Sequence, residues 1–425
     1  MSGTLGLVFV VLLAIGVPVT VALTLAGVAA IELHTGLTLL VVIQQFYAAL
    51  DKFPLVAIPF FILSGNLMQE SGISARLVEF ARAVVGRVQG GLAISCVLTC
   101  MIFAAVSGSS VATTFAIGTV LIPAMVRAGY PVAHAAALQA AAAELGIIIP
   151  PSIPMILYGV SADVSIAELF VAGFGPGLLI AAALSAWIFI WCRRRGYGHG
   201  DGAGRLTLGV ATRRAWTALL MPVIVLGGIY GGIFTPTEAS AVAVAYALMV
   251  GVAVDRTLGW AGLVRALRSS AMSTSIIMLI IAPAGLFAFL LTRSGAAHGL
   301  ATFIGELIAA DWQFLLLVNG LLFLLGMFVD SGAMILVLAP ILTPIAESFR
   351  VDPVHFGLIM VVSAALGMIT PPFAVNLFAV CSVARLSYEQ VIRPIIPFVL
   401  VVGACQLTIT FVPWISLGLR DLVFR

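Results

Sequence analysis

The stretch that decides the fold is Glu144-Leu145-Gly146-Ile147-Ile148-Ile149-Pro150-Pro151-Ser152, which has a counterpart in Ala365-Leu366-Gly367-Met368-Ile369-Thr370-Pro371-Pro372-Phe373. Both are apolar segments interrupted by two prolines. Proline lacks the N–H that a helix interior needs, so each stretch predicts a helix that stops and restarts. The prolines lie 371 − 150 = 221 residues apart, as do Gly146 and Gly367. The spacing therefore predicts two related halves.

A short run of small or polar residues precedes each double proline. Ser107-Gly108-Ser109-Ser110 lies in the apolar stretch 92–126, and Asp330-Ser331-Gly332 lies in the stretch 313–347. We expect each stretch to form a re-entrant helical hairpin whose tip is the polar run. Irregular backbone at membrane depth is tolerated only where protein encloses it or water reaches it. The broken helices that follow are predicted over 133–160 and 354–383.

Composition places the chain in a membrane. Hydrophobic residues make up 62% of its 425 residues and charged residues only 9%, whereas soluble domains carry about 25% charged residues. Many apolar segments reach the roughly 20 residues that a helix needs to cross the hydrocarbon, and strand-like alternation is not evident. The fold class is therefore an all-α polytopic membrane protein.

The other apolar segments complete the predicted set of spans and define the two repeats. We predict a first span over 4–31, a surface arm over 257–271 and a span over 272–292. The domain organisation that follows is a first repeat over 1–192, a cytoplasmic linker over 193–214, a connecting span over 215–236 and a second repeat over 237–425.

The basic residues predict the orientation. With the N-terminus in the cytoplasm, fifteen of the twenty basic residues fall on the cytoplasmic side, as the positive-inside rule requires. The five that fall outside are Lys52, Arg293, Arg350, Arg420 and Arg425. This topology places the C-terminus in the periplasm. It also makes the two hairpins enter the membrane from opposite sides. The repeats are therefore predicted to be inverted with respect to each other.

Interrupted helices leave backbone groups that can bind ions and substrates. Carbonyl oxygens without an intrahelical partner suit a hard cation such as Na⁺, and helix N-termini with hydroxyl groups suit a carboxylate. The predicted Na⁺ ligands are Ser107, Gly108, Ser109, Ser110, Ile149 and Pro150 in one cage, and Asp330, Ser331, Gly332, Gly367, Thr370 and Pro371 in the other. The plain alternative is that the prolines only kink their helices.

A second set of residues is predicted to contact the substrate: Ser110, Thr113, Ser152, Asp330, Asn376 and Glu144. For Asp330 the alternative is a helix cap. For Glu144 three roles stay open, namely a proton site, a substrate contact and an exposed position at the cytoplasmic vestibule. Hydroxyl groups in helices commonly bind their own helix carbonyls, and that alternative stays open for Thr113 and Thr370.

Other functional classes lack support in the sequence. The net charge of +3 is dispersed, which gives no nucleic-acid-binding patch, and the five cysteines have no metal-site spacing. Zinc-protease, serine-hydrolase and Walker A motifs are absent, so we do not expect an enzyme or an ATP-driven pump. A passive channel or permease is the alternative to a coupled transporter.

Together the motifs resemble the large permease subunit of TRAP transporters, the DctM family. The residues that carry this resemblance are Pro59-Phe60-Phe61-Ile62-Leu63-Ser64-Gly65-Asn66-Leu67-Met68, the Ser107 tip, Ile149-Pro150-Pro151-Ser152-Ile153, Gly232-Ile233-Phe234-Thr235-Pro236-Thr237-Glu238-Ala239, Gly326-Met327-Phe328-Val329-Asp330 and Thr370-Pro371-Pro372. The similarity spans nearly the whole chain. Glu144 departs from the small or hydroxylated residue expected there.

The resemblance implies a secondary transporter of the bacterial inner membrane. It would import an organic anion, such as a C4-dicarboxylate, a sialic acid or a sugar acid, together with two or more Na⁺ ions. Its partners would be a small four-helix membrane subunit, a periplasmic substrate-binding protein and the surrounding lipid. The family fold implies an elevator mechanism, in which the hairpins and broken helices carry the substrate while the arms stay fixed.

Overall fold

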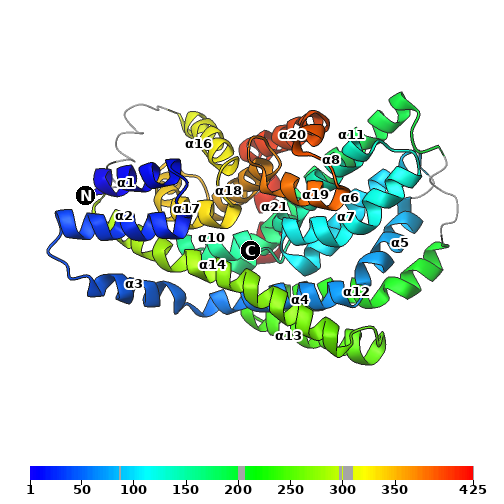
Figure 1. The fold of residues 1–425 in the computed structure, drawn as a ribbon, viewed down its shortest axis with the longest axis horizontal. Coiled ribbons are helices and arrows are strands. Elements are labelled where there is room, and N and C mark those ends of the chain that lie inside the picture. The colour runs from blue at the N-terminus through cyan, green and yellow to red at the C-terminus, as the bar shows by residue number, and fades with distance from the viewer. Residues whose placement is uncertain (86–87, 200–205, 296–298, 300–309, 425) are drawn as a thin grey trace.

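The computed structural model describes residues 1–85, 88–199, 206–295, 299 and 310–424, and this part of the chain is helical without strands (Figure 1). The first half contains α1 (Ser2–Ala14), α2 (Val19–His34), α3 (Leu40–Leu50), the 3₁₀ turn η1 (Phe53–Val56), α4 (Ala57–Glu70), α5 (Ile73–Val85), α6 (Gly91–Ser107), α7 (Ser110–Arg127), α8 (Val132–Ala143), α9 (Leu145–Ile148), α10 (Ile153–Ala162) and α11 (Ile166–Arg195).

The second half contains α12 (Leu208–Tyr230), α13 (Pro236–Met249), the π-helical η2 (Val250–Val254), α14 (Trp260–Arg293), α16 (Asp311–Gly326), α17 (Ser331–Ser348), α18 (Pro353–Met368), α19 (Val375–Ala384), α20 (Tyr388–Phe411) and α21 (Trp414–Phe424). Within the described ranges, 8 helices are long and apolar enough to cross a membrane, or 9 if the bent pair α8–α9 and α10 counts as one. The chain is therefore a multi-pass membrane protein.

Both double prolines interrupt their helices, as the sequence predicts. The helix of α8 and α9 ends at Ile148 and α10 begins at Ile153, with a bend of 41° between them. In the second half α18 ends at Met368 and α19 begins at Val375. The Pro150–Pro151 and Pro371–Pro372 peptide bonds are both cis.

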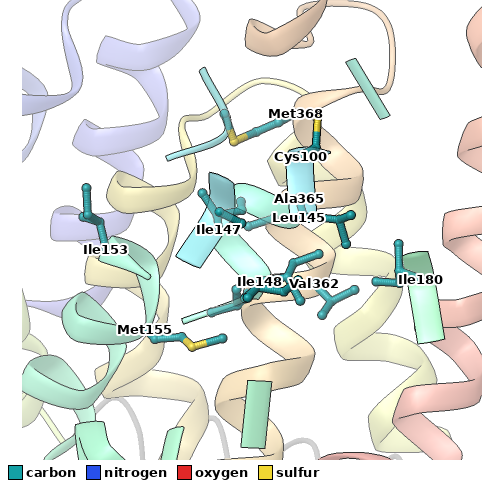
Figure 2. Packing of buried hydrophobic residues seen from close by; sticks show 14 of the residues in the cluster. Cys100, Leu145, Ile147, Ile148, Ile153, Met155, Ile180, Val362, Ala365 and Met368 are labelled. Carbon is teal, nitrogen blue, oxygen red and sulfur yellow. The ribbon is translucent and has the colours of Figure 1, made fainter. Parts of the chain in front are cut away.

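The two broken helices form the core. The residues of α8 from His134 to Ala143 are all buried, and so are those of α18 from Val354 to Met368. A helix that is apolar all round is expected to be enclosed on every side. Figure 2 shows Ile148 of the first broken helix lying beside Val362 of the second, within one apolar cluster.

A continuous helix runs along the outside of this core. α14 spans 34 residues and packs along α2, α3 and α4 (Figure 1). The sequence predicts an arm over 257–271 and a separate span over 272–292, and this division is wrong because one helix covers both segments. Pro283 lies inside α14 without ending it.

The predicted single span over 4–31 is also wrong. The segment forms two helices, α1 and α2, that pack against each other as a hairpin, and Thr4 Oγ1 lies 2.6 Å from His34 Nε2. The turn contains Gly16 at φ +83° and Pro18, which precedes α2. Glycine adopts this left-handed conformation without steric cost, and proline cannot continue the first helix.

The predicted linker and connecting span are largely helical. α11 extends to Arg195 and α12 begins at Leu208, while residues 200–205 of the linker lie outside the described residues. α12 packs against α5 and α13, and the Tyr246 hydroxyl donates to the carbonyl of Thr217 at 2.8 Å.

Close helix contacts in the core depend on glycine. A Cβ placed on Gly367 would lie 2.4 to 2.7 Å from backbone atoms of Gly326, so α16 and α18 touch backbone to backbone. In lipid, where helices gain little from hydrophobic burial, such close packing is a main source of association energy. The second hairpin is therefore seated on the second broken helix through these two glycines.

Replacing Gly367 by alanine tests this contact. We expect Gly367→Ala to lower the free energy of unfolding by about 1–3 kcal/mol, because the backbone of Gly326 cannot move aside as a flexible side chain would. Unfolding of the full-length protein in mixed detergent micelles measures the change. Gly320→Ala on α16 is the matched control, since nothing lies within 4 Å of its added Cβ. Equal effects of the two substitutions would contradict the proposed contact.

Candidate functional site

A cavity of about 440 Å³ lies where the two polar tips meet. The first tip and α7 contribute Gly108, Ser109, Ser110 and Val111, and the second tip contributes Asp330, Ser331 and Gly332. The start of α10 and one face of α14 form further walls. The structure therefore places segments more than 200 residues apart in the chain around one open cavity.

The first tip is a tight turn between α6 and α7. Gly108 ends α6 at φ +63°, and Ser109 caps α7 by accepting a hydrogen bond from the N–H of Ala112 at 3.4 Å. The Ser107 hydroxyl lies 3.0 Å from that of Thr113. The Thr113 hydroxyl also donates to the carbonyl of Ser109 at 2.8 Å, which is the own-helix alternative considered for it. The tip is thus held by its own side chains.

The first break packs directly on this tip. The N–H of Ile153 donates to the carbonyl of Gly108 at 3.4 Å, and a Cβ on Gly108 would lie 2.9 Å from the carbonyl oxygen of Pro151. Ser152 caps α10 and donates its hydroxyl to the carbonyl of Ile147 at 2.5 Å. The predicted pairing of the Ser107–Ser110 tip with the Ile149–Ser152 break is therefore present in the structure.

The second tip presents an acidic side chain to the cavity. Asp330 caps α17 by accepting from the N–H of Gly332 at 2.9 Å, and its side chain is exposed at the cavity. The capping alternative is thus realised together with a position in the site. Of the described residues that line the cavity, Asp330 is the charged one.

The second break meets its hairpin differently from the first. Here Gly326, four residues before the Asp330 tip, touches Gly367. Thr370 donates its hydroxyl to the carbonyl of Leu366 at 2.6 Å, which satisfies its own helix, while the Tyr388 hydroxyl binds the carbonyl of Pro372 at 2.8 Å. Of this segment, the cavity is lined by Met368 and Val375 rather than by Thr370 or Pro371.

A buried polar chain links the two halves behind the cavity. Thr114 of α7 donates its hydroxyl to Asn376 Oδ1 at 2.6 Å, and Asn376 Nδ2 donates to Glu144 Oε1 at 2.7 Å. All three side chains have 0% exposed surface. The exposed position considered for Glu144 is therefore wrong. The chain connects the first tip, the first broken helix and the second broken helix.

The predicted substrate residues divide into two groups. Ser110 and Asp330 line the cavity, whereas Thr113, Ser152, Asn376 and Glu144 lie behind its wall. The sequence did not identify the residues of α14 that complete the site, namely Ser273, Ile276, Ile277 and Ile280. Their periodic spacing on one face is the signal that was available, but in a uniformly apolar helix it does not distinguish a cavity wall from ordinary packing.

Comparison with known proteins agrees with this architecture. Residues 6–415 match the family model described as "Tripartite ATP-independent periplasmic transporter, DctM component". The chain belongs to the DctM family. It is 41% identical over 377 residues to the C4-dicarboxylate TRAP transporter large permease protein of Pseudomonas aeruginosa, covering 89% of this chain and 88% of that one. The family is a transporter permease and not an enzyme.

Other DctM relatives are named for different solutes. The ectoine/5-hydroxyectoine permease of Ruegeria pomeroyi is 36% identical over 100% of both chains, and the sialic acid permease of Vibrio cholerae is 34% identical over 99% of this chain and 97% of its own. Among solved structures, the YdaH transporter of Alcanivorax borkumensis is similar in fold, with a TM-score of 0.65 and 17% identity over 89% of this chain and 88% of that one.

The polar chain behind the cavity yields a double-mutant test. Thr114→Val and Asn376→Leu each remove one end of the same hydrogen bond, so the double variant is expected to lose less stability than the sum of the single variants. The expected coupling is about 0.6 to 2 kcal/mol, the range for hydrogen bonds between membrane helices. Unfolding in mixed micelles measures it. Losses that simply add would show that the two side chains act independently.

Proposed function

We propose that this DctM-family chain is the large membrane subunit of a Na⁺-coupled importer of organic anions. The observation that carries the proposal is the cavity between the two tips, which combines helix N-termini, hydroxyl groups and interrupted backbone in the middle of an apolar protein. Broken helices at a midplane site are the arrangement by which secondary transporters bind substrate and coupling ion. A substrate carboxylate would lie at the N-terminus of α7 near Ser110, and Na⁺ would bind at the two tip-and-break pairs.

The division into inverted repeats is part of this proposal. α7 begins at Ser110 and α17 at Ser331, which is 331 − 110 = 221 residues later, and α8 and α18 begin at Val132 and Pro353 with the same offset. The first repeat would then cover 1–192 and the second 237–425, with the linker and α12 between them. In this arrangement α6–α7 and α16–α17 are re-entrant hairpins that enter from opposite faces.

Ion pairs support the predicted orientation of the chain across the membrane. Arg76 with Asp255, Arg214 with Glu79 and Arg265 with Glu70 join segments that the positive-inside rule assigns to the cytoplasm. Arg420 with Asp352 and Glu168 joins segments assigned to the periplasm, together with the C-terminus.

We infer the orientation of the N-terminus from the α1–α2 hairpin. The Thr4–His34 contact brings the chain back to the side from which it starts, so we place the N-terminus on the same face as Lys52, on the periplasmic side. The expectation of a cytoplasmic N-terminus depended on a single span over 4–31 and is not retained.

An elevator movement fits the layout. α14 packs against α3 and α4 along one side of the molecule, and the broken helices α8 and α18 are buried in the core beside this layer (Figure 1). We propose that the buried block carries the substrate while the outer layer stays fixed in the bacterial inner membrane. A small four-helix membrane subunit and a periplasmic binding protein would complete the transporter.

Uptake into proteoliposomes tests this function. The chain is reconstituted with its proposed small membrane subunit, and a labelled C4-dicarboxylate and a labelled sialic acid are each offered with a binding protein for that solute. Because one charge crossing the membrane is worth about 2.3 kcal/mol per 100 mV, import of a dianion with more than two Na⁺ is expected to be stimulated by an inside-negative potential. Uptake indifferent to Na⁺ would contradict the proposal.

The same assay separates a coupled transporter from a passive permease. A coupled transporter accumulates the solute above its external concentration, whereas a passive permease stops at equality. We expect accumulation that collapses when choline replaces Na⁺.

Asp330 supplies a residue-level prediction for this assay. Asp330→Asn removes the charge that faces the cavity while keeping the cap oxygen, so uptake is expected to fall by about tenfold or more with the fold intact. Asp311→Asn, at the exposed start of α16, is the matched control and is expected to transport normally. Normal uptake by Asp330→Asn would show that transport does not require the Asp330 charge, and it would contradict the proposed role.

A further inference from the structure

Glu144 is a carboxylate that the transport cavity does not use. Its side chain has 0% exposed surface, and it does not line the cavity. Oε1 accepts from Asn376, while Oε2 has no hydrogen-bond partner within the described part of the chain. No described Lys, Arg or His forms an ion pair with it either. One carboxylate oxygen is therefore enclosed and unoccupied by any donor.

The charge of such a group must be compensated. An ionised carboxylate in an apolar interior costs several kcal/mol unless it is paired, so the carboxyl group either keeps a proton or binds a positive charge. The negative charge of Asp330 acts on Glu144 as well, which increases the demand. The described ion pairs do not include Glu144, so a bound cation is the partner that would let its carboxyl group stay ionised.

The first tip lies close to Glu144. The Ser110 side chain acts on the Glu144 carboxyl group at short range, although no hydrogen bond joins its hydroxyl to Oε2. Two residues further on, a Cβ on Gly146 would lie 2.7 Å from both the Ser109 carbonyl oxygen and the Thr113 hydroxyl oxygen, so the absence of a side chain at Gly146 lets the first tip approach the broken helix closely. The first tip therefore packs against the segment of the broken helix that contains Glu144.

The donor set selects the type of cation. Hard oxygen ligands suit Na⁺-like or alkaline-earth cations, whereas transition metals in proteins favour imidazole and thiolate ligands. Among the described residues, no group of three His, Cys, Asp or Glu side chains is placed to hold a metal ion. With a single carboxylate, a monovalent cation leaves the site neutral and a divalent cation does not.

We propose that Glu144 is a direct ligand of a monovalent cation of the Na⁺ class, bound between its free Oε2, the Ser110 hydroxyl and the first tip. The site gives this chain a full negative charge where the freed backbone alone would supply only partial charges. Through Asn376 and Thr114, the same carboxylate connects the ion to the second broken helix and to α7. The inference rests on the cation coupling in the proposed function, and it adds the ligand that fixes one of the ions.

The test is a Na⁺ titration of the thermal stability of the full-length chain in detergent, with choline chloride keeping the ionic strength constant. A ligand that binds only the folded state stabilises it by RT ln(1 + [Na⁺]/Kd), so fitting the melting temperature against Na⁺ concentration yields an apparent Kd, the half-saturating Na⁺ concentration. Glu144→Gln keeps the shape and the oxygen that accepts from Asn376 but removes the charge. We expect its half-saturating concentration to rise by about tenfold or more.

Two further variants make the result decisive. Glu347→Gln changes an exposed glutamate of α17 in the same way and is expected to titrate like the wild type. Glu144→Asp keeps the charge but moves the carboxylate back by one methylene group, so it is expected to weaken Na⁺ binding. This variant provides a second test if Glu144→Gln does not fold.

The outcomes distinguish this inference from the proposed function. An unchanged half-saturating concentration in Glu144→Gln, or in Glu144→Asp if only that variant folds, overturns the role of Glu144 alone. A wild-type protein that Na⁺ does not stabilise overturns the cation coupling of the proposed function together with it.

Discussion

The structure depends on how a membrane protein satisfies backbone groups where helices break. In hydrocarbon, each unpaired N–H or carbonyl costs several kcal/mol, so broken helices persist only where protein, ions or water supply partners. This chain breaks two core helices and turns two others at polar tips, and it collects these interruptions in one region. There the Ser152 hydroxyl satisfies the carbonyl of Ile147 and the N–H of Ile153 reaches the carbonyl of Gly108.

Close packing encloses part of these interruptions. Glycines stand where one backbone meets another: Gly108 against Pro151, Gly146 against Ser109, and Gly326 against Gly367. The alanine-rich α8 and the apolar α18 are enclosed on all sides, so the broken helices act as the centre around which the hairpins are seated. α14 packs against α3 and α4 to form an outer layer beside this centre, and none of these three helices is broken by a double proline.

Much of this architecture is visible in the sequence, because local chemistry marks it. Proline pairs mark the breaks, small polar runs mark the tips, and composition marks the membrane. The turn at Gly16 to Pro18 was missed because the apolar run continues on both sides of it, and the α14 wall was missed because its cavity-facing residues are as apolar as its others. The chain Thr114–Asn376–Glu144 joins residues 232 to 262 positions apart, which no local pattern predicts.

The central claim is that the interrupted backbone at the two tip-and-break pairs holds coupling ions next to the substrate cavity. Equilibrium binding of radioactive sodium to the purified full-length chain tests it most directly, because it counts ions without requiring the substrate or the partner proteins. The account predicts saturable binding of two or more Na⁺ per chain, displaced by unlabelled Na⁺ and not by choline. Binding of no Na⁺ above the background of a soluble control protein would contradict it.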